Sequence, residues 1–349
     1  MIEIDGSIGE GGGQVLRSAL TLAILTNQGV HLTNIRARRP KPGLKPQHLK
    51  AVDAAAAISK AQVEGATLNS QELIFLPSEL HSGRYKFDIG TAGATTLVLQ
   101  TIFLPLSLAA AASSVIITGG THVPWSPCYH YLEFQWLPYL KMIGFNAQLS
   151  LEQAGFYPQG GGRISASIRP VNQISPLNLV ERGALLRVNG LSAVANLNIN
   201  IAERQKRQAL GRLQKFDWGT RRPEVKIKIT QLPSPYKGTL LILLAEFESG
   251  RCCYYGLGAL GKPAERVADD AIDSLLAFVD TDAVIDQYLA DQLLLPLCLA
   301  GGESQIHTCQ ITQHLLTNIA VLQAFLPVTI AVQGDLGQPG LVRILPISS

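Results

Sequence analysis

The sequence predicts an α/β (α+β) fold with a larger part built from similar units and a smaller separate module. Short apolar strands alternate with amphipathic helices along the 349 residues, and 47% hydrophobic residues suffice for two sizeable cores. A triple glycine at 11–13 recurs at 160–162, with a weaker echo at 301–302, which indicates repeated units. Between 181 and 239 the chain becomes basic, with twelve Lys and Arg against four Asp and Glu.

The chain opens with a strand at 2–4, the glycine-rich turn GEGGGQVLR at 9–17 and a helix at 15–25. Four glycines in five positions let backbone N–H groups at the helix start approach an anion. The turn is not a Walker loop, and Gln14 stands where a dinucleotide fingerprint needs glycine. The carboxylate of Glu10 among these amides predicts a divalent cation between it and a bound phosphate. A solvent-facing glutamate in an ordinary turn is the alternative.

A basic loop follows the second strand, which is expected at 30–35. Six of the fifteen residues at 36–50 are basic and none is acidic. Its prolines exclude a regular basic helix, so the cations at its start are available to grip several phosphates, ahead of Gln47 and His48 in the next helix. These cations are Arg36, Arg38, Arg39 and Lys41. A solvated loop is the alternative. A helix at 47–61 and strands at 63–68 and 72–76 complete the unit.

A second unit is expected to contain a strand at 84–89, an apolar helix with Gln100, and a strand at 113–118. No charged residue occurs from 89 to 132, but polar residues, Pro105 and glycines interrupt the stretch, which favours buried elements over a membrane span. The loop GGTHVPWSP at 119–127, with Tyr131 just beyond, offers the faces of Pro127 and of aromatic rings. Such faces can hold a purine or simply pack in the loop.

The basic module is expected to contain strands at 184–189, 224–229 and 239–247 and a basic helix at 202–215. Its charge indicates either nucleic-acid binding or an ordinary solvated surface. A helix at 263–279 follows, and then a helical segment that places Tyr288, Asp291 and Gln292 near one face. The chain ends with strands at 304–309, 328–332 and 341–344 and a helix after the first of them.

That last helix carries the histidine that is best placed for chemistry. Thr312 is a good N-cap and puts His314 in the first turn, where the helix dipole keeps the imidazole neutral and favours a bound phosphoryl group. A structural histidine is the alternative. No HxH or HExxH spacing indicates zinc. Five cysteines without CxxC spacing and an acidic N-terminus without a signal sequence predict a cytoplasmic protein.

Five segments then converge on one family. In this order, DGSIGEGGGQVLRSAL, RPKPGLKPQH, GFYPQGGGR, ADQLLLPLCLAGG and QHLLTNIAV resemble the RNA 3′-terminal phosphate cyclases over essentially the whole chain. The resemblance implies a large domain of three repeated βαβαββ units at 1–180 and 277–349, with a smaller α/β domain inserted at 181–276. It implies ATP-dependent conversion of an RNA 3′-phosphate end to a 2′,3′-cyclic phosphate through enzyme-histidyl-AMP and RNA-(3′)pp(5′)A intermediates.

The same resemblance implies roles for individual residues. His314 looks like the nucleophile and Glu10 like the residue that meets Mg²⁺ or Mn²⁺. Phosphate contacts are implied for Arg17, Arg36, Arg39, Gln14 and Gln47, an adenine sandwich for Pro127, Tyr131 and Tyr288, and nucleotide contacts for Gln100, Asp291 and Gln292. The sequence departs from the family at Ala154, where Arg or His is favoured, and at His122, where Asp is common. Both departures put local loop geometry or end preference in doubt.

Three other functions stay open at this point. A ribosomal-RNA-processing relative without cyclase activity would lack the histidine of HLLTN. An enolpyruvyl-transferase-like enzyme would share the repeated architecture but need neither this nucleophile nor a basic module. A pure nucleic-acid-binding module would bind RNA without consuming ATP. The combination of His314, Glu10 and the basic loop favours the cyclase, with ATP and RNA 3′-phosphate ends as partners, no membrane partner and an open oligomeric state.

Overall fold

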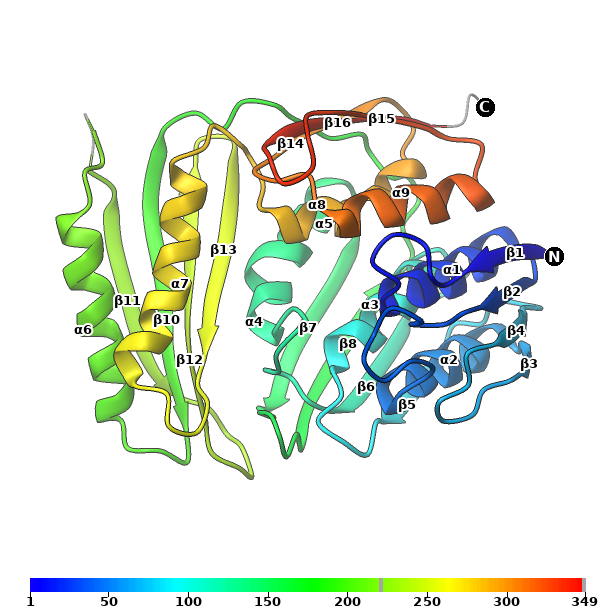
Figure 1. Cartoon of the computed structure of the whole chain (residues 1–349), viewed down its shortest axis with the longest axis horizontal. Helices are drawn as coiled ribbons and strands as arrows, with labels where there is room; N and C mark the ends of the chain where they lie inside the picture. The colour runs from blue at the N-terminus through cyan, green and yellow to red at the C-terminus, as the bar shows by residue number, and fades with distance from the viewer. Residues whose placement is uncertain (220–221, 347–349) are drawn as a thin grey trace.

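The computed structural model describes residues 1–219 and 222–346 (Figure 1). It has a mixed α/β architecture with four four-stranded sheets, which confirms the predicted class. Arg221, one of the basic residues counted above, lies outside the described residues. Within the described ranges, every helix is too short or too polar to cross a bilayer.

The first sheet has the order β1-β2-β4-β3. Its unit comprises β1 (Ile2–Asp5), α1 (Gly13–Thr26), β2 (Val30–Thr33), α2 (Pro46–Ser59), β3 (Gln62–Glu64) and β4 (Leu73–Leu76). Strands β1 and β2 are parallel, because α1 connects them, and β4 is antiparallel to β2 and β3. The strand predicted at 63–68 is wrong beyond Glu64, since Gly65 takes a φ of +78° and turns the chain.

Two further sheets repeat this pairing, with orders β5-β6-β8-β7 and β9-β14-β16-β15. In each, the first two strands are parallel and the following pairs are antiparallel. The second group comprises β5 (Arg84–Asp88), α3 (Thr95–Ser107), β6 (Ser113–Gly119), α4 (Tyr129–Tyr131), the π-helical η1 (Leu132–Trp136), α5 (Leu137–Met142), β7 (Asn146–Gln153) and β8 (Gly162–Arg169). The third comprises β9 (Asn178–Leu179), α8 (Gln287–Cys298), β14 (Ser304–Thr308), α9 (Gln313–Phe325), β15 (Thr329–Gln333) and β16 (Gly340–Leu345).

The fourth sheet lies between β9 and α8 in the sequence and at the left of Figure 1. It belongs to β10 (Leu185–Ala195), α6 (Asn200–Lys215), β11 (Glu224–Gln231), β12 (Gly238–Phe247), β13 (Gly250–Leu257) and α7 (Ala264–Val279). Leu241 and Leu243 of β12 face a separate core with the two helices, while Leu240 and Ile242 pack with the larger part. Alternation along one strand therefore serves two cores.

Part of the basic charge of α6 is used inside this module. Arg204 pairs with Glu265 at 2.7 Å, and Arg212 pairs with Asp269 at 3.0 Å and with Asp273 at 2.7 Å. All three carboxylates belong to α7, so these two arginines fasten one helix to the other.

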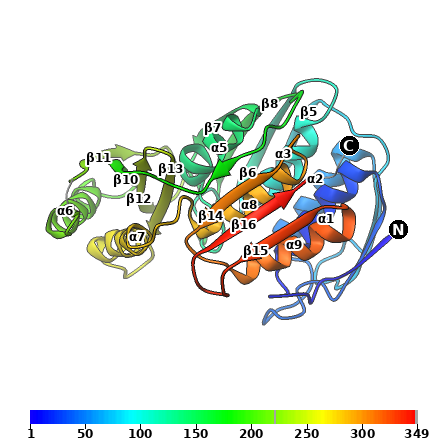
Figure 2. The ribbon, with the colours of Figure 1, turned by 90° about the horizontal axis from the view of Figure 1, so that it is seen from above.

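The helices of the larger part meet in its middle, and the sheets lie outside them (Figure 2). Helix α1 contacts α2, α3 and α9, and α8 contacts α9. This packing brings the N-terminal end of α1 next to the first turn of α9, although the two helices stand at opposite ends of the sequence.

Candidate active site

The glycine-rich turn before α1 lies against α9. Gly9 has a φ of +61°, and a Cβ there would come within 1.9 Å of the Thr317 hydroxyl oxygen. A Cβ at Gly12 would come within 2.7 Å of Nη2 of Arg39. Gly12 is also the N-cap of α1 and offers no side-chain acceptor, so the first N–H groups of α1 lack a side-chain cap. The missing side chains let α9 and Arg39 reach a backbone that has donors suited to an anion.

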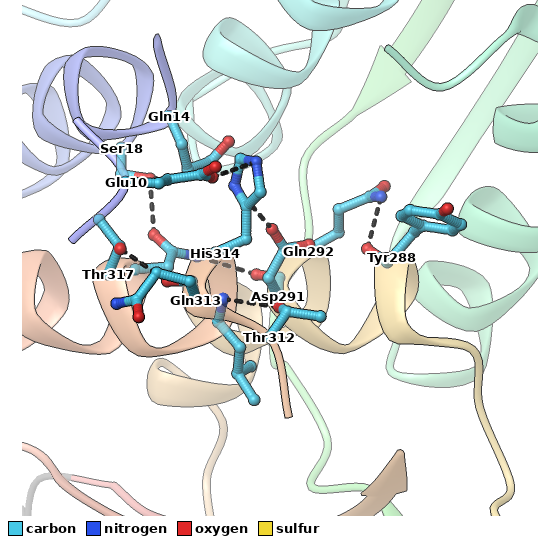
Figure 3. Close-up of polar contacts among 12 residues, drawn as sticks. Glu10, Gln14, Ser18, Tyr288, Asp291, Gln292, Thr312, Gln313, His314 and Thr317 are labelled. Atoms are coloured by element: carbon cyan, nitrogen blue, oxygen red, sulfur yellow. Dashed lines mark hydrogen bonds and ion pairs between the residues drawn. The ribbon is translucent and has the colours of Figure 1, made fainter. Parts of the chain in front are cut away.

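His314 stands in the first turn of α9, as the sequence predicts. The helix begins after Thr312, whose hydroxyl accepts a 3.0 Å hydrogen bond from the N–H of Leu315. Nε2 of His314 contacts Oε1 of Glu10, and Nδ1 lies 3.8 Å from Oδ2 of Asp291 (Figure 3). The imidazole therefore sits between carboxylates from the turn before α1 and from α8.

The surroundings of His314 favour its neutral form. Burial lowers the pKa of His314, and the cations of Arg17 and Arg39 lower it further, while the carboxylate of Glu10 opposes the shift. Nδ1 is buried and has no hydrogen-bond partner among the described residues. A neutral imidazole keeps a lone pair on one nitrogen, which is what a nucleophile needs.

A second pair of groups with opposite charge, Arg17 and Asp291, lies close to His314. Burial raises the pKa of Asp291 to about 7. The nearby cation of Arg17 opposes this rise, whereas the carboxylates of Asp286 and Glu10 add to it. Burial likewise lowers the pKa of Arg17 to about 10, against the attraction of Asp291 and Glu10. Asp291 can thus gain or lose a proton near neutral pH.

A chain of hydrogen bonds ties these groups together beneath the site. Nη2 of Arg17 donates to Gln14 at 2.7 Å, Nε2 of Gln14 donates to the Ser18 hydroxyl at 3.2 Å, and that hydroxyl donates to Asn318 at 2.7 Å. Nδ2 of Asn318 donates to the backbone carbonyl of Asp291 at 2.9 Å. Ser18 and Asn318 are not predicted from the sequence, although Asn318 stands one helical turn after His314 and so shares its face.

Some arginines of the basic loop contact the site, and one contacts the backbone of the loop itself. Arg39 pairs with Oε2 of Glu10 at 3.2 Å, and Nη1 of Arg38 donates to the carbonyl of Gly9 at 2.6 Å. Arg36 instead donates to the carbonyls of Lys41 and Gly43 at 2.8 and 2.7 Å. In this structure Arg36 therefore holds the loop, and its phosphate contact stays a prediction.

His48 is a buried residue below the turn. Its Nδ1 accepts a 3.1 Å hydrogen bond from the N–H of Lys45, which assigns the ring proton to Nε2. A Cβ at Gly13 would come within 2.5 Å of that Nε2. Burial lowers the pKa of His48 to about 3, with Arg17, Arg36 and Lys45 adding to the shift. His48 is therefore an uncharged donor directed at the start of α1.

The predicted nucleotide residues on α3 and α8 line one cavity of about 90 Å³. Its polar lining includes Gln14, Arg17, Gln100, Asp291 and Gln292, and its apolar lining includes Phe103, Trp136 and Phe145. Nε2 of Gln100 donates to Gln292 at 2.7 Å, and Gln292 donates to the carbonyl of Tyr288 at 2.6 Å. The Tyr288 side chain is half exposed beside them.

The other predicted adenine residues occupy different environments. The carbonyl of Pro127 accepts a 2.7 Å hydrogen bond from Thr96, at the start of α3. Tyr131 is buried, and its hydroxyl donates to Asp286 at 2.7 Å. Gln47, which is predicted as a phosphate contact, accepts from the N–H of Ala94 at 3.0 Å. Tyr131 thus has a packing position in this structure, and its adenine contact stays a prediction.

The two positions that depart from the family are both buried. His122 makes a 2.7 Å contact with the Thr121 hydroxyl and a 2.8 Å contact with Nδ1 of His130. Burial lowers the pKa of His122 well below its ordinary value. Ala154 donates its N–H to the carbonyl of Pro233 at 2.7 Å, in the basic module. The buried polar groups of His122 and the backbone N–H of Ala154 therefore both have partners.

A divalent cation fits this site only with help from a bound substrate. Among residues 1–219 and 222–346, no group of three or more His, Cys, Asp or Glu side chains could hold a metal ion. Oε1 of Glu10 is nevertheless buried and accepts no well-aligned hydrogen bond from the described residues. Magnesium commonly binds one or two carboxylates together with substrate phosphates and water, and Glu10 matches that donor pattern.

Comparison with known proteins identifies the relatives of this chain. The sequence model of the family described as RNA 3′-terminal phosphate cyclase matches residues 8–332. The protein of that name from Nostoc punctiforme is 44% identical over 332 residues, which cover 93% of this chain and 94% of the relative. The Pseudomonas fluorescens protein is 45% identical over 331 residues, covering 95% and 94%, and the Staphylothermus marinus protein is 40% identical over 352 residues, covering 99% and 98%.

A solved structure of the enolpyruvyl transferase NikO from Streptomyces tendae aligns with 100% of this chain and 66% of its own chain, at a TM-score of 0.24 and 9% identity. A likeness at this level supports no conclusion about fold or function.

Proposed function

This chain belongs to the RNA 3′-terminal phosphate cyclase family, and we propose that it uses ATP to convert RNA 3′-phosphate ends to 2′,3′-cyclic phosphates. The observation that carries the proposal is the position of His314. Nε2 of its imidazole contacts Oε1 of Glu10, and the other oxygen of that carboxylate pairs with Arg39, next to the N-terminal end of α1. A neutral imidazole, the cations of Arg17 and Arg39, and helix N–H groups without a side-chain cap suit the transfer of a charged phosphoryl group.

In the first step, Nε2 of His314 attacks the α-phosphorus of ATP. The bond from that phosphorus to the bridging oxygen breaks, pyrophosphate leaves with its electron pair, and AMP becomes bonded to Nε2. Attack through Nε2 requires the proton of the imidazole to be on Nδ1, where Asp291 is the nearby acceptor at 3.8 Å. The lowered pKa of His314 keeps the imidazole neutral, so that one of its two nitrogens carries a lone pair.

In the second step, an oxygen of the RNA 3′-phosphate attacks the same phosphorus and breaks its bond to Nε2. His314 is regenerated, and the product is RNA-(3′)pp(5′)A. In the third step, the neighbouring 2′-hydroxyl attacks the 3′-phosphorus, AMP leaves, and the hydroxyl proton passes to AMP or solvent. Because the 2′-hydroxyl is adjacent, proximity supplies much of the rate of this step, and its presence distinguishes RNA from DNA ends.

The residues around His314 would hold the phosphates during these steps. We assign Arg17 and Arg39 to the transferring phosphoryl group, together with the N–H groups at the start of α1. Mg²⁺ or Mn²⁺ held by Glu10 would neutralise phosphate charge. The adenine and ribose are assigned to Tyr288, Gln100, Asp291 and Gln292 near the cavity.

The same proposal extends to the architecture and the place of reaction. The three sheets with equal pairing are interpreted as repeated βαβαββ units, at 1–180 and 277–349, with the module at 181–276 inserted into the third. The reaction is expected in the cytoplasm, which contains both ATP and RNA ends.

Labelling with ATP tests the first step directly. The protein is incubated with ATP labelled at the α-phosphate and Mg²⁺ or Mn²⁺, and we expect a protein-bound label that is labile to acid and stable to alkali. His314→Ala should abolish the label. His81→Ala, in the loop before β5, is the matched control and should retain it.

Wild-type protein without label, or label that persists in His314→Ala, would contradict the mechanism. A protein that binds RNA 3′-phosphate ends but neither takes up label nor makes cyclic ends would instead be a relative without cyclase activity.

A further inference from the structure

Trp125 is the most unusual exposed side chain near the site. Its relative exposure is 100%, and its φ is +64°, a left-handed conformation that is uncommon for a bulky residue. A tryptophan in this position gains no packing energy and stores backbone strain. Strain of this kind concentrates at functional sites, and exposed apolar surface marks interaction sites.

Trp125 belongs to one of three loops that meet around Phe156. We name the segments 119–127, 155–163 and 232–238 the three-loop surface. The ring of His122 stacks on Phe156 at 5.0 Å, and a Cβ at Gly238 would come within 2.1 Å of the same ring. The second and third loops add the exposed rings of Tyr157 and Tyr236, at 66% and 44% relative exposure.

The three-loop surface carries positive charge and no negative charge. None of its three segments contains Asp or Glu, whereas Arg163 and Lys237 are exposed. Nη1 of Arg163 approaches Glu152 only to 3.9 Å, at the limit of an ion pair. Proteins that bind single-stranded nucleic acids combine exposed aromatic rings with cations. The rings stack on the bases and the cations contact the phosphates.

The surface adjoins the proposed nucleotide site through the start of α3. Thr96 of α3 holds the carbonyl of Pro127, and the N–H of Ala94, just before the helix, is held by Gln47. Two residues of chain span at most about 7 Å, so Trp125 lies close to Pro127. Contacts thus lead from Gly120 of the first loop through Ala94 to Gln47, a predicted phosphate contact, and we expect an RNA whose 3′ end reaches His314 to extend in this direction.

We propose that the three-loop surface binds the single-stranded RNA upstream of the 3′-phosphate by stacking its bases on Trp125, Tyr157 and Tyr236. The proposal rests on the proposed function for the identity of the ligand. Stacking on rings is tolerant of base identity, so the surface favours longer single strands without selecting a sequence.

Substrate length provides the first test. KM is measured for a 3′-phosphorylated dinucleotide and for a 3′-phosphorylated octanucleotide of single-stranded RNA. Trp125→Ala and Tyr236→Ala are expected to raise KM for the octanucleotide about tenfold, with unchanged kcat and little change for the dinucleotide. Leu68→Ala removes an exposed apolar side chain from the β3–β4 turn and is the control without effect.

Equal KM values for wild type and variants with the octanucleotide would overturn the proposal. So would an equal rise for both substrates, which would indicate disturbed loops, or variants that change only the oligomeric state, which would indicate a contact between copies of the chain.

Tryptophan fluorescence provides a test that is independent of catalysis. Trp136 is buried and Trp218 is partly buried, so an octanucleotide with an unreactive 3′-hydroxyl should quench mainly Trp125. The quenching should disappear in Trp125→Phe, and its persistence there would contradict stacking on this ring. Absence of the His314 label in wild type would instead refute the proposed function. Quenching of Trp125 would still show whether the three-loop surface binds RNA.

Discussion

The hydroxyl of Ser18 donates a 2.7 Å hydrogen bond to Oδ1 of Asn318, three hundred positions later in the chain. Nδ2 of the same Asn318 donates to the backbone carbonyl of Asp291. One buried amide therefore connects α1, α9 and α8, the helices that carry Gln14, His314 and Asp291.

Replacement of this amide should loosen both the fold and the site. Asn318→Ala leaves the carbonyl of Asp291 without its donor, which costs about 1–3 kcal/mol of the free energy of unfolding. We also expect slower labelling of His314, because the hydrogen bond that positions α8 relative to α9 is lost. Urea denaturation and labelling rates measure the two effects. Ser18→Ala removes one of the two bonds and should have a smaller effect; equal stability of Asn318→Ala and wild type would refute the role.

Neutralisation of Glu10 should slow the first step. Glu10→Gln keeps the size of the side chain but removes the charge that faces Arg39 and His314, and we expect labelling to slow by about two orders of magnitude. The rate is measured over a range of Mg²⁺ and Mn²⁺ concentrations. Glu72→Gln, an exposed glutamate beside β4, is the control. An unchanged rate at every concentration would remove Glu10 from the site.

Asp291 should make stability depend on pH. Its pKa is raised from 3.8 to about 7, so between these values the folded protein holds a proton that the unfolded chain has released. This contribution to stability is present at low pH and is lost as pH rises through 7. Relative to wild type, Asp291→Asn should be more stable at pH 8 than at pH 5, by about 2–3 kcal/mol.

Urea denaturation of ligand-free protein at both pH values measures this difference. Asp53→Asn changes an exposed carboxylate on α2 and is the matched control. If the free energies of unfolding of wild type and Asp291→Asn differ by the same amount at pH 5 and at pH 8, the raised pKa is contradicted.

Two tyrosines should separate adenine binding from packing. Tyr288→Ala removes a half-exposed ring beside the cavity and should raise KM for ATP about tenfold. Tyr131→Phe removes the hydroxyl that donates to buried Asp286 and should cost about 1–3 kcal/mol of stability, with little change in KM for ATP. Steady-state kinetics and urea denaturation measure both. A large rise of KM in Tyr131→Phe would support its predicted adenine contact.

Local signals predict much of the fold. The N-cap at Thr312 is confirmed, and the helix predicted at 202–215 is observed at Asn200–Lys215. No strands are predicted at β7 or β8, although Ala147, Leu149 and Leu151 alternate with polar residues as a half-buried strand requires. The run of apolar residues in β13 is likewise not predicted as a strand. Strands β7 and β8 could have been found from their period of two.

The site is predictable only as far as motifs reach. Glu10 and His314 stand in recognisable segments, and the structure brings them into contact. Asp286 gives no such signal, because its importance depends on burial next to Tyr131 and Gln135 from a distant helical segment. Side-chain partners across hundreds of residues follow from tertiary packing, which no local pattern encodes.

The packing of α9 against α1 also means that the proposed site is assembled only after α9 has been synthesised. Translation proceeds from the N-terminus, so the turn, the arginines and Asp291 all leave the ribosome before His314. Under the proposed mechanism, a chain that stops before residue 314 would have the residues assigned to the phosphates but no nucleophile. The proposed chemistry would therefore begin only after α9 has been made.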